Sequence, residues 1–274
     1  MLQELLSALF FGVLEGVTEW LPVSSTGHLI LLDGILSPPW RPAFAELFLV
    51  VIQLGAMGAV PVLFWQRLCP VGRGKAGAER KRILSLWGKV LIAALPAAVV
   101  GLLLDSRLEE TLYRPPVVAS ALILYGVAFI LLEKRRKTAP SAGIAEDVPV
   151  KTAFLIGLFQ ALALVPGTSR SGATVVGGLS LGVSRPAAAE FSFFLGIPTM
   201  LGAGLLKSVR FFAEGNALCG NEALLLALGC GTAFLVSLVA VRFLMELVRR
   251  HSFAGFGVYR ILLGGAVLAL WIFQ

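Results

Sequence analysis

The sequence has 274 residues, of which 57% are hydrophobic and 14% are charged, and its mean hydropathy of +0.88 excludes a soluble globular domain of this length. Thirty glycines fit helices that pack closely in a bilayer, where small residues let backbones approach. The net charge of +7 is gathered in short loops beside apolar runs, as the positive-inside rule expects, so nucleic acid is not an expected partner.

The N-terminal segment MLQELLSALF lacks the basic start and the small-residue cleavage site of a signal peptide, so its removal is not expected. After it, six apolar runs reach the length of about 20 residues that a helix needs to cross a bilayer. They lie at about 43–66, 83–104, 117–133, 186–206, 222–248 and 253–273. Basic clusters at 67–82, at 134–137 and at Arg242, Arg249 and Arg250 predict three cytoplasmic places. The cysteines show no metal-ligand or redox spacing.

The segments before the first and fourth runs cannot cross if these places are cytoplasmic. The chain up to Arg41 must begin and end outside, and 152–184 must begin and end inside. Each of the two is long enough for a helix to mid-membrane, a turn at Pro22 or Pro166, and a return. We therefore expect two re-entrant hairpins that enter from opposite faces; the alternative is that 4–36 forms one ordinary crossing with a polar end.

Two internal repeats support this division. The sequence GVLEGVTEWLPVSSTGH at 12–28 matches GLFQALALVPGTSRSGA at 157–173, and RPAFAE at 41–46 matches RPAAAE at 185–190. The prediction is an all-α integral membrane protein with two inverted-topology repeats, each a re-entrant helical hairpin plus three transmembrane helices. Repeat 1 covers 1–133, a polar linker covers 134–150 and repeat 2 covers 151–274, within one membrane domain. Inverted repeats with broken helices commonly place a site near the midplane where the repeats meet.

Glu15 and Glu19 lie four residues apart on an apolar helix, so both project from one face. Like charges at this spacing repel, and burial makes each carboxylate harder to ionise. A divalent cation such as Mg²⁺ or Ca²⁺, a nearby arginine or a proton on one carboxylate would compensate. The plain alternative is a solvated helix end.

The run after Pro22 places hydroxyls and an imidazole close together, at Ser24, Ser25, Thr26 and His28. This set supplies hydrogen-bond donors, a nucleophile and a proton carrier. Ser24 or Ser25 could instead cap the next helix, and the two roles are compatible because a helix N-terminus also binds phosphate.

The second copy is the natural anion site, because its glycines let the backbone approach and Arg170 offers a planar fork for phosphate. An arginine this deep in apolar sequence needs a partner, either phosphate or Glu15 and Glu19; the alternative is a pairing with protein carboxylates alone. The predicted anion-binding residues are Gly167, Ser169, Arg170, Ser171, Gly172 and Thr174, with Ser24 and Thr26 from the first copy.

Structural roles are favoured for the remaining charged residues in apolar sequence. The matching Glu46 and Glu190 suggest ion pairs with Arg41 and Arg185 near the helix starts. Arg260 is also favoured as structural.

The motifs together resemble the undecaprenyl-diphosphate phosphatase family, the bacterial bacitracin-resistance proteins. The resemblance rests on GVLEGVTEWLPVSSTGH, VVIQLGA, QALALVPGTSRSGAT, AAEFSFFLGIP and GVYR, and runs from about Leu5 to Arg260. It implies a re-entrant inverted-repeat enzyme of the bacterial inner membrane that removes the terminal phosphate of undecaprenyl diphosphate at a site facing the periplasm. Relatives often carry an acidic residue where this chain has Leu49, so a role for that carboxylate is dispensable or absent here.

Carried onto this chain, the family motifs fall on Glu15, Glu19, Ser25 and His28, which are the expected catalytic residues. Glu15 and Glu19 would either bind a divalent cation as metal ligands or position water. We hypothesise Ser25 as nucleophile with His28 as its base, against a metal-bound water. Apolar walls would hold the polyprenyl tail, no organic cofactor is expected, and a homodimer remains open. The alternative function is a lipid-phosphate flippase or an anion transporter using the same site.

Overall fold

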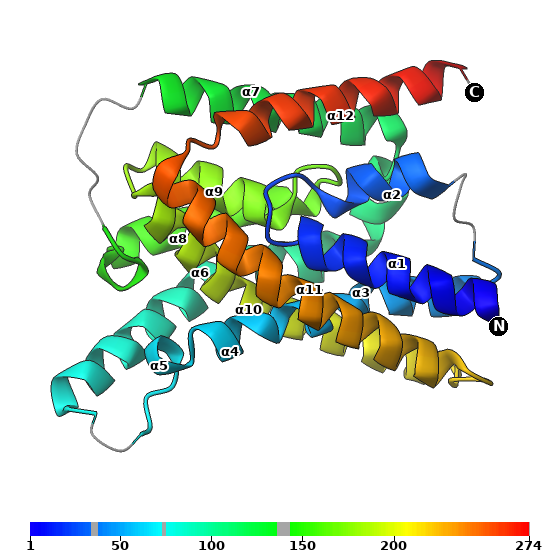
Figure 1. The fold of residues 1–274 in the computed structure, drawn as a ribbon, viewed down its shortest axis with the longest axis horizontal. Coiled ribbons are helices and arrows are strands. Elements are labelled where there is room, and N and C mark those ends of the chain that lie inside the picture. The colour runs from blue at the N-terminus through cyan, green and yellow to red at the C-terminus, as the bar shows by residue number, and fades with distance from the viewer. Residues whose placement is uncertain (34–37, 73–74, 136–142, 274) are drawn as a thin grey trace.

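The computed structural model describes residues 1–33, 38–72, 75–135 and 143–273, and helices dominate this part of the chain (Figure 1). The helices are α1 Leu2–Thr18, α2 Ser25–Asp33, α3 Pro42–Met57, α4 Ala59–Leu63, α5 Trp65–Leu68, α6 Gly77–Leu112, α7 Pro115–Arg135, α8 Val150–Ala161, α9 Arg170–Ser180, α10 Arg185–Ala213, α11 Glu222–Arg250 and α12 Ala254–Phe273. Two short 3-10 turns, η1 Ala145–Asp147 and η2 Leu162–Leu164, complete the described elements.

Six helical stretches are long and apolar enough to cross a membrane, which confirms the six predicted spans and the class of integral membrane protein. They cover Pro42–Leu63, Gly77–Leu103, Pro115–Arg135, Arg185–Ala213, Glu222–Arg250 and Ala254–Phe273. The most enclosed of them is α10, whose phenylalanines form the centre of the core with Trp20 and Phe64.

The two segments that precede the first and fourth spans are both broken helices. The first hairpin consists of α1, a turn at 19–24 and α2; the second consists of α8, η2, a turn at 165–169 and α9. With 9 and 11 residues, α2 and α9 extend only about 14–17 Å, roughly half the thickness of the hydrocarbon core. The alternative of one continuous crossing over 4–36 is wrong, because the helix ends at Thr18 and a new one begins at Ser25.

The two halves are intertwined. Helix α1 of the first hairpin packs on α11, and α8 of the second hairpin packs on α6, so each hairpin lies against the second long helix of the other half. Helices α7 and α12 lie side by side along one edge of the molecule (Figure 1). The close approach requires glycine at equivalent places: a Cβ at Gly12 would meet the Gly229 carbonyl oxygen at 2.7 Å, and one at Gly157 would meet the Ala93 backbone.

The repeated RPAFAE and RPAAAE segments form ion pairs between the halves, so the predicted pairing of Glu46 and Glu190 with Arg41 and Arg185 is wrong. Glu46, near the start of α3, accepts from Lys207 near the end of α10 at 2.7 Å. Glu190, near the start of α10, accepts from Arg67, which follows α3 and α4, at 2.8 Å. The end of α10 therefore supplies a cation to the start of α3, and α5, which follows α3 and α4, supplies one to the start of α10.

The two arginines of these segments have other partners. Arg41 precedes the first turn of α3 in an extended conformation and reaches Glu222 at 2.7 Å, while Arg185 reaches Glu133 at the end of α7 at 2.6 Å. Both arginines thus have the structural role predicted for them, but their ion pairs join two different helices instead of lying within one helix.

The predicted linker is docked at its described end. Arg67 donates from Nε to Glu146 of η1 at 2.7 Å while it also holds Glu190. Burial alone would raise the pKa of the Glu146 carboxyl. Hydrogen bonds from Arg67 and from its own backbone amide, together with the charges of Arg67 and Arg82, outweigh burial and hold this pKa below its ordinary value. One arginine therefore ties the linker to the first long helix of each half.

Candidate active site

The turns of the two hairpins meet, and Arg260 of α12 joins them. Its Nη1 donates to the carbonyl oxygen of Pro22 at 3.1 Å, and its Nη2 donates to those of Gly167 and Thr168 at 2.8 Å each. The side chain is fully buried and its guanidinium lies over the Tyr125 ring at 5.6 Å. The structural role favoured for Arg260 is confirmed, with both turns as its partners.

Each turn ends in a serine that caps the following helix. Ser24 and Ser169 are the two non-glycine residues with positive φ in the described chain, at 72° and 67°. Ser24 Oγ accepts from the Gly27 amide at 3.5 Å, and Ser169 Oγ accepts from the Gly172 amide at 3.2 Å. The predicted cap is confirmed at Ser24. Because left-handed backbone costs energy in such residues, the two turns hold strain where two helix N-termini face the site.

Arg170 is the first residue of α9 and forms an ion pair with Glu19, with Nε at 3.0 Å from Oε1. Its Nη1 donates to the carbonyl oxygen of Ser192 at 2.7 Å, and its guanidinium lies over the Trp20 ring at 5.8 Å. Its Nη2 is buried and has no hydrogen-bond partner among the described residues. Arg170 is therefore fixed in place by protein groups on two sides while one donor stays available.

Glu15 lies beside this ion pair. It is buried, it interacts electrostatically with Glu19 and with Arg170, and its Oε1 has no hydrogen-bond partner in the described chain. An unsatisfied buried carboxylate oxygen next to a second carboxylate is a chemically reasonable place for a hard cation. The described residues contain no group of three or more histidine, cysteine, aspartate or glutamate side chains around such a place.

The hydroxyls of the second hairpin divide into two sets. Ser169 and Ser171 hydrogen-bond each other at 3.1 Å at the start of α9, and Ser171 also donates to the Leu21 carbonyl oxygen at 3.4 Å. Thr174 instead points into the protein, where its hydroxyl is 2.6 Å from that of Ser192. Gly167 has a φ of +91°, which a side chain would resist.

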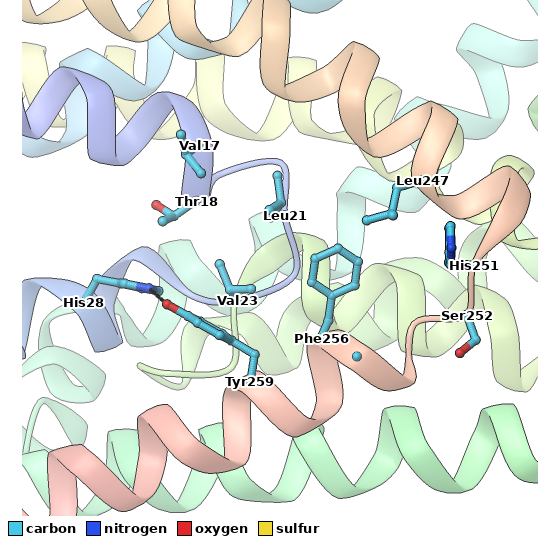
Figure 2. A pocket seen from close by; sticks show the side chains of 11 residues that line it. Val17, Thr18, Leu21, Val23, His28, Leu247, His251, Ser252, Phe256 and Tyr259 are labelled. Carbon is cyan, nitrogen blue, oxygen red and sulfur yellow. Dashed lines mark hydrogen bonds between the residues drawn. The ribbon is translucent and has the colours of Figure 1, made fainter.

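The structure places Ser25 and Thr26 in the first turn of α2, both half-buried. In this structure the two ring nitrogens of His28 bond to groups other than the Ser25 hydroxyl. Its Nδ1 is 2.7 Å from the Ser24 carbonyl oxygen, and its Nε2 is 2.7 Å from the Tyr259 hydroxyl, a contact that Figure 2 shows. To take a proton from Ser25, the ring would have to release or share one of these partners.

A cavity of about 650 Å³ opens beside the first turn, between the end of α1, the turn itself and the junction of α11 with α12. Its walls are mainly apolar, with His28 and Tyr259 at one end and His251 and Ser252 at the other (Figure 2). The cavity therefore leads from the polar turn along the apolar side chains toward the basic end of α11.

Sequence reasoning missed several residues that shape this site. Ser192 and Gly196 of α10 surround Arg170, Trp20 lies under it, and Tyr259 contacts His28. They occur in apolar sequence without a local chemical pattern, so only their places in AAEFSFFLGIP, EWLP and GVYR could have drawn attention to them.

The close contact of Arg170 with α10 gives a first prediction. A Cβ at Gly196 would lie 2.9 Å from Cζ of Arg170, so Gly196→Ala must displace the guanidinium. We expect the substitution to lower the kcat/KM for phosphate release by about 10- to 100-fold, since small displacements of a positioning group are costly. Gly202→Ala on the same helix is the control, because a Cβ there meets nothing within 4 Å. Equal rates for the two variants would contradict the placement of Arg170.

These features define a class: a helical membrane protein in which the turns of two broken-helix hairpins meet at a buried cluster of polar side chains. The chain belongs to the bacitracin resistance protein BacA family, whose sequence model matches residues 8–266. It is 47% identical over 268 residues to an undecaprenyl-diphosphatase of Enterococcus faecalis, with 97% of each chain covered. It is 51% identical over 266 residues to an undecaprenyl-diphosphatase of Streptococcus thermophilus, covering 97% of this chain and 92% of the relative. A Streptococcus pyogenes undecaprenyl-diphosphatase is 48% identical over 272 residues, with 99% and 98% covered.

Proposed function

We propose that this chain hydrolyses undecaprenyl diphosphate to undecaprenyl phosphate and inorganic phosphate, which recycles the lipid carrier for cell-wall synthesis. The observation that carries the proposal is the meeting of two serine-capped helix N-termini with Arg170 and a pair of carboxylates inside a membrane domain. A diphosphate needs positive and hydrogen-bonding groups at such a depth, and its hydrolysis depends mainly on positioning and charge stabilisation.

The second hairpin would hold the diphosphate. Arg170 Nη2 is available to donate, and the start of α9 adds the positive end of a helix. Ser169 and Ser171 would add hydroxyl donors, and Ser24 and Thr26 would do so from the first hairpin. Thr174 would support the site through Ser192 and not by direct contact.

The first hairpin would carry out the chemistry. Ser25 Oγ would attack the terminal phosphorus as His28 accepts the hydroxyl proton, the bridging P–O bond would break, and undecaprenyl phosphate would leave. Water would then attack the phosphoserine to release inorganic phosphate. Direct attack by water on the terminal phosphorus is the competing route.

A divalent cation, Mg²⁺ or Ca²⁺, fits the carboxylate pair. Glu15 and Glu19 would hold it, with the unpartnered Oε1 of Glu15 as one ligand; Mg²⁺ often uses only one or two protein carboxylates and completes its shell with phosphate oxygens and water. When bound, it would supply neutralisation of phosphate charge. Arg170 would keep Glu19 oriented toward the same place.

The apolar cavity beside the first turn would take the first part of the polyprenyl tail. Its position next to His28 continues the path from the diphosphate into apolar walls, and each buried CH2 contributes about 0.8 kcal/mol. Tail length should therefore affect KM more than kcat.

The topology supports a site that opens to the periplasm. In Figure 1, α1 and α2 lie toward the end of the molecule where the N-terminus lies, and α8 and α9 lie toward the opposite end. The basic helix α5 and the basic C-terminal ends of α7 and α11 also lie at that opposite end. By the positive-inside rule that basic end would be cytoplasmic, which favours inverted repeats and a first hairpin that enters from the periplasm of the bacterial inner membrane. A homodimer remains a prediction.

Purified protein in detergent tests the function. With a long polyprenyl diphosphate and either Mg²⁺ or Ca²⁺, we expect phosphate release that depends on the cation and stops on chelation. A rapid acid quench should trap phosphate on Ser25, and Ser25→Ala should release phosphate at least about 100-fold more slowly. Full activity in Ser25→Ala would favour direct attack by water, whereas binding without release by the wild type would favour a transporter.

A further inference from the structure

We propose that Tyr259 is the positioning residue of His28: its hydroxyl and ring fix the orientation of the imidazole and hold Nε2 at the substrate cavity. The kinetic part of this inference rests on the proposed function, while the part that concerns the His28 ring does not.

The tautomer follows from the two hydrogen bonds of the ring. A carbonyl oxygen can only accept, so the 2.7 Å contact between His28 Nδ1 and the Ser24 carbonyl requires a proton on Nδ1. In the neutral ring, Nε2 then carries the lone pair, and the Tyr259 hydroxyl at 2.7 Å donates to it. The carbonyl of Ser24, just before α2, thus selects the tautomer. The Tyr259 hydroxyl of α12 then binds the other ring nitrogen.

The contact is also a packing contact. The His28 and Tyr259 rings are stacked, with centroids 5.7 Å apart and an angle of 18° between their planes. Both residues line the same end of the cavity (Figure 2), so the Nε2 atom and the hydroxyl share the space that leads to the substrate tail. The ring of Tyr259 limits rotation of the His28 ring, and its hydroxyl fixes the direction in which Nε2 points.

Tyr259 is itself well placed for this role because of its neighbour in sequence. Arg260 binds the backbone of both turns, which fixes α12 relative to the first hairpin. Helix α12 also packs on α2, the helix that carries His28. Arg260 therefore holds the backbone of the first hairpin's turn, and the adjacent Tyr259 holds the His28 side chain of the same hairpin.

A phenol hydroxyl suits a general base because it is both donor and acceptor. It donates to the one lone pair of Nε2 in the neutral ring, so it must release that lone pair before Nε2 takes the proton of Ser25. The Tyr259 oxygen can then accept from Nε2 of the imidazolium. In many enzymes a third group orients the general base. Here two groups orient His28, the Ser24 carbonyl at Nδ1 and the Tyr259 hydroxyl at Nε2.

The experiment uses the fact that the chain contains only two histidines. In full-length protein labelled with ¹⁵N-histidine, NMR of the ring nitrogens should show His28 as a single neutral tautomer protonated at Nδ1; the signals lost in His28→Ala assign it. Tyr259→Phe keeps the stacked ring and removes the hydroxyl. We expect it to shift the Nε2 signal while Nδ1 stays protonated, and to lower kcat about tenfold with little change in KM.

A double-mutant cycle separates positioning from simple stabilisation. In the His28→Ala background, Tyr259→Phe should no longer change kcat, and Tyr113→Phe, an exposed tyrosine before α7, should not change it in either background. An unchanged His28 spectrum in Tyr259→Phe, or the same loss of rate with and without His28, would overturn the proposal. If the wild type releases no phosphate, the proposed function fails, and the ¹⁵N spectra still decide whether Tyr259 fixes His28.

Discussion

Replacing Arg170 with lysine is expected to lower the kcat/KM for phosphate release by about 100-fold or more while the protein stays folded. The guanidinium donates to Glu19 through Nε and to the Ser192 carbonyl through Nη1, which leaves Nη2 for the diphosphate. A lysine ammonium can keep the positive charge beside Glu19, but it cannot serve three directions from one rigid plane. Steady-state kinetics with polyprenyl diphosphate, beside a thermal unfolding curve in detergent, measures the effect.

Two further variants make this result specific. Arg250→Lys changes an exposed arginine at the end of α11, where the side chain pairs with Glu246 one turn earlier, and should leave the rate unchanged. Arg170→Ala should be both inactive and less stable, because Glu19 would be buried without its partner. A near wild-type rate in Arg170→Lys would mean that Arg170 serves as a structural partner of Glu19 alone.

The spans and the broken hairpins could be predicted from the sequence because hydropathy and basic loops act locally. Twenty apolar residues predict a crossing wherever they occur, and Pro22 with its polar sequel predicts a break. The partners of Glu46 and Glu190 could not be predicted in this way, since they depend on how α3 and α10 lie against each other. Charge pairing within one repeated segment was the simplest reading, and the packing of the two halves overrides it.

The site shows the same limit. The motif residues named from the sequence include the ion pair of Arg170 with Glu19, and the repeat correctly placed Ser24 and Ser169 at equivalent positions. The supporting groups come from α10 and α12, far away in the chain and embedded in apolar sequence. A tyrosine such as Tyr259 in a membrane helix is ordinarily interpreted as an interfacial residue, and only the fold brings its hydroxyl to His28.

The duplicated turns explain how one backbone design could serve two tasks. In each, a strained serine caps a helix, and the next residue, Ser25 or Arg170, is the first residue of that helix. The two helix starts thus present one residue each to the shared site, a hydroxyl from the first hairpin and a guanidinium from the second. Divergence at this single position separates the predicted nucleophile, Ser25, from the predicted phosphate-binding cation, Arg170.

Arg260 is the residue on which the meeting of these two turns depends, so Arg260→Met should cost both stability and activity. Methionine fills the space and removes three hydrogen bonds, which leaves the carbonyl oxygens of Pro22, Gly167 and Thr168 without their donor. Buried acceptors without partners cost about 1–3 kcal/mol each, so we expect a loss of about 3 kcal/mol or more in the free energy of unfolding. The lower melting temperature in detergent measures this loss.

Activity must be measured on the folded protein to separate the two effects. At a temperature well below the melting transition of Arg260→Met, we still expect kcat to fall by about 100-fold, because the two helix starts would no longer be held at a fixed distance. Arg260→Lys should be intermediate in stability, since one ammonium lies on a flexible stem and cannot reproduce the planar fork. Arg249→Met, at the exposed end of α11, is the matched control and should retain both the melting temperature and the rate. A folded Arg260→Met with wild-type kcat would show that the turns hold their positions without the arginine, and that the caps and the Arg170–Glu19 pair suffice to assemble the site.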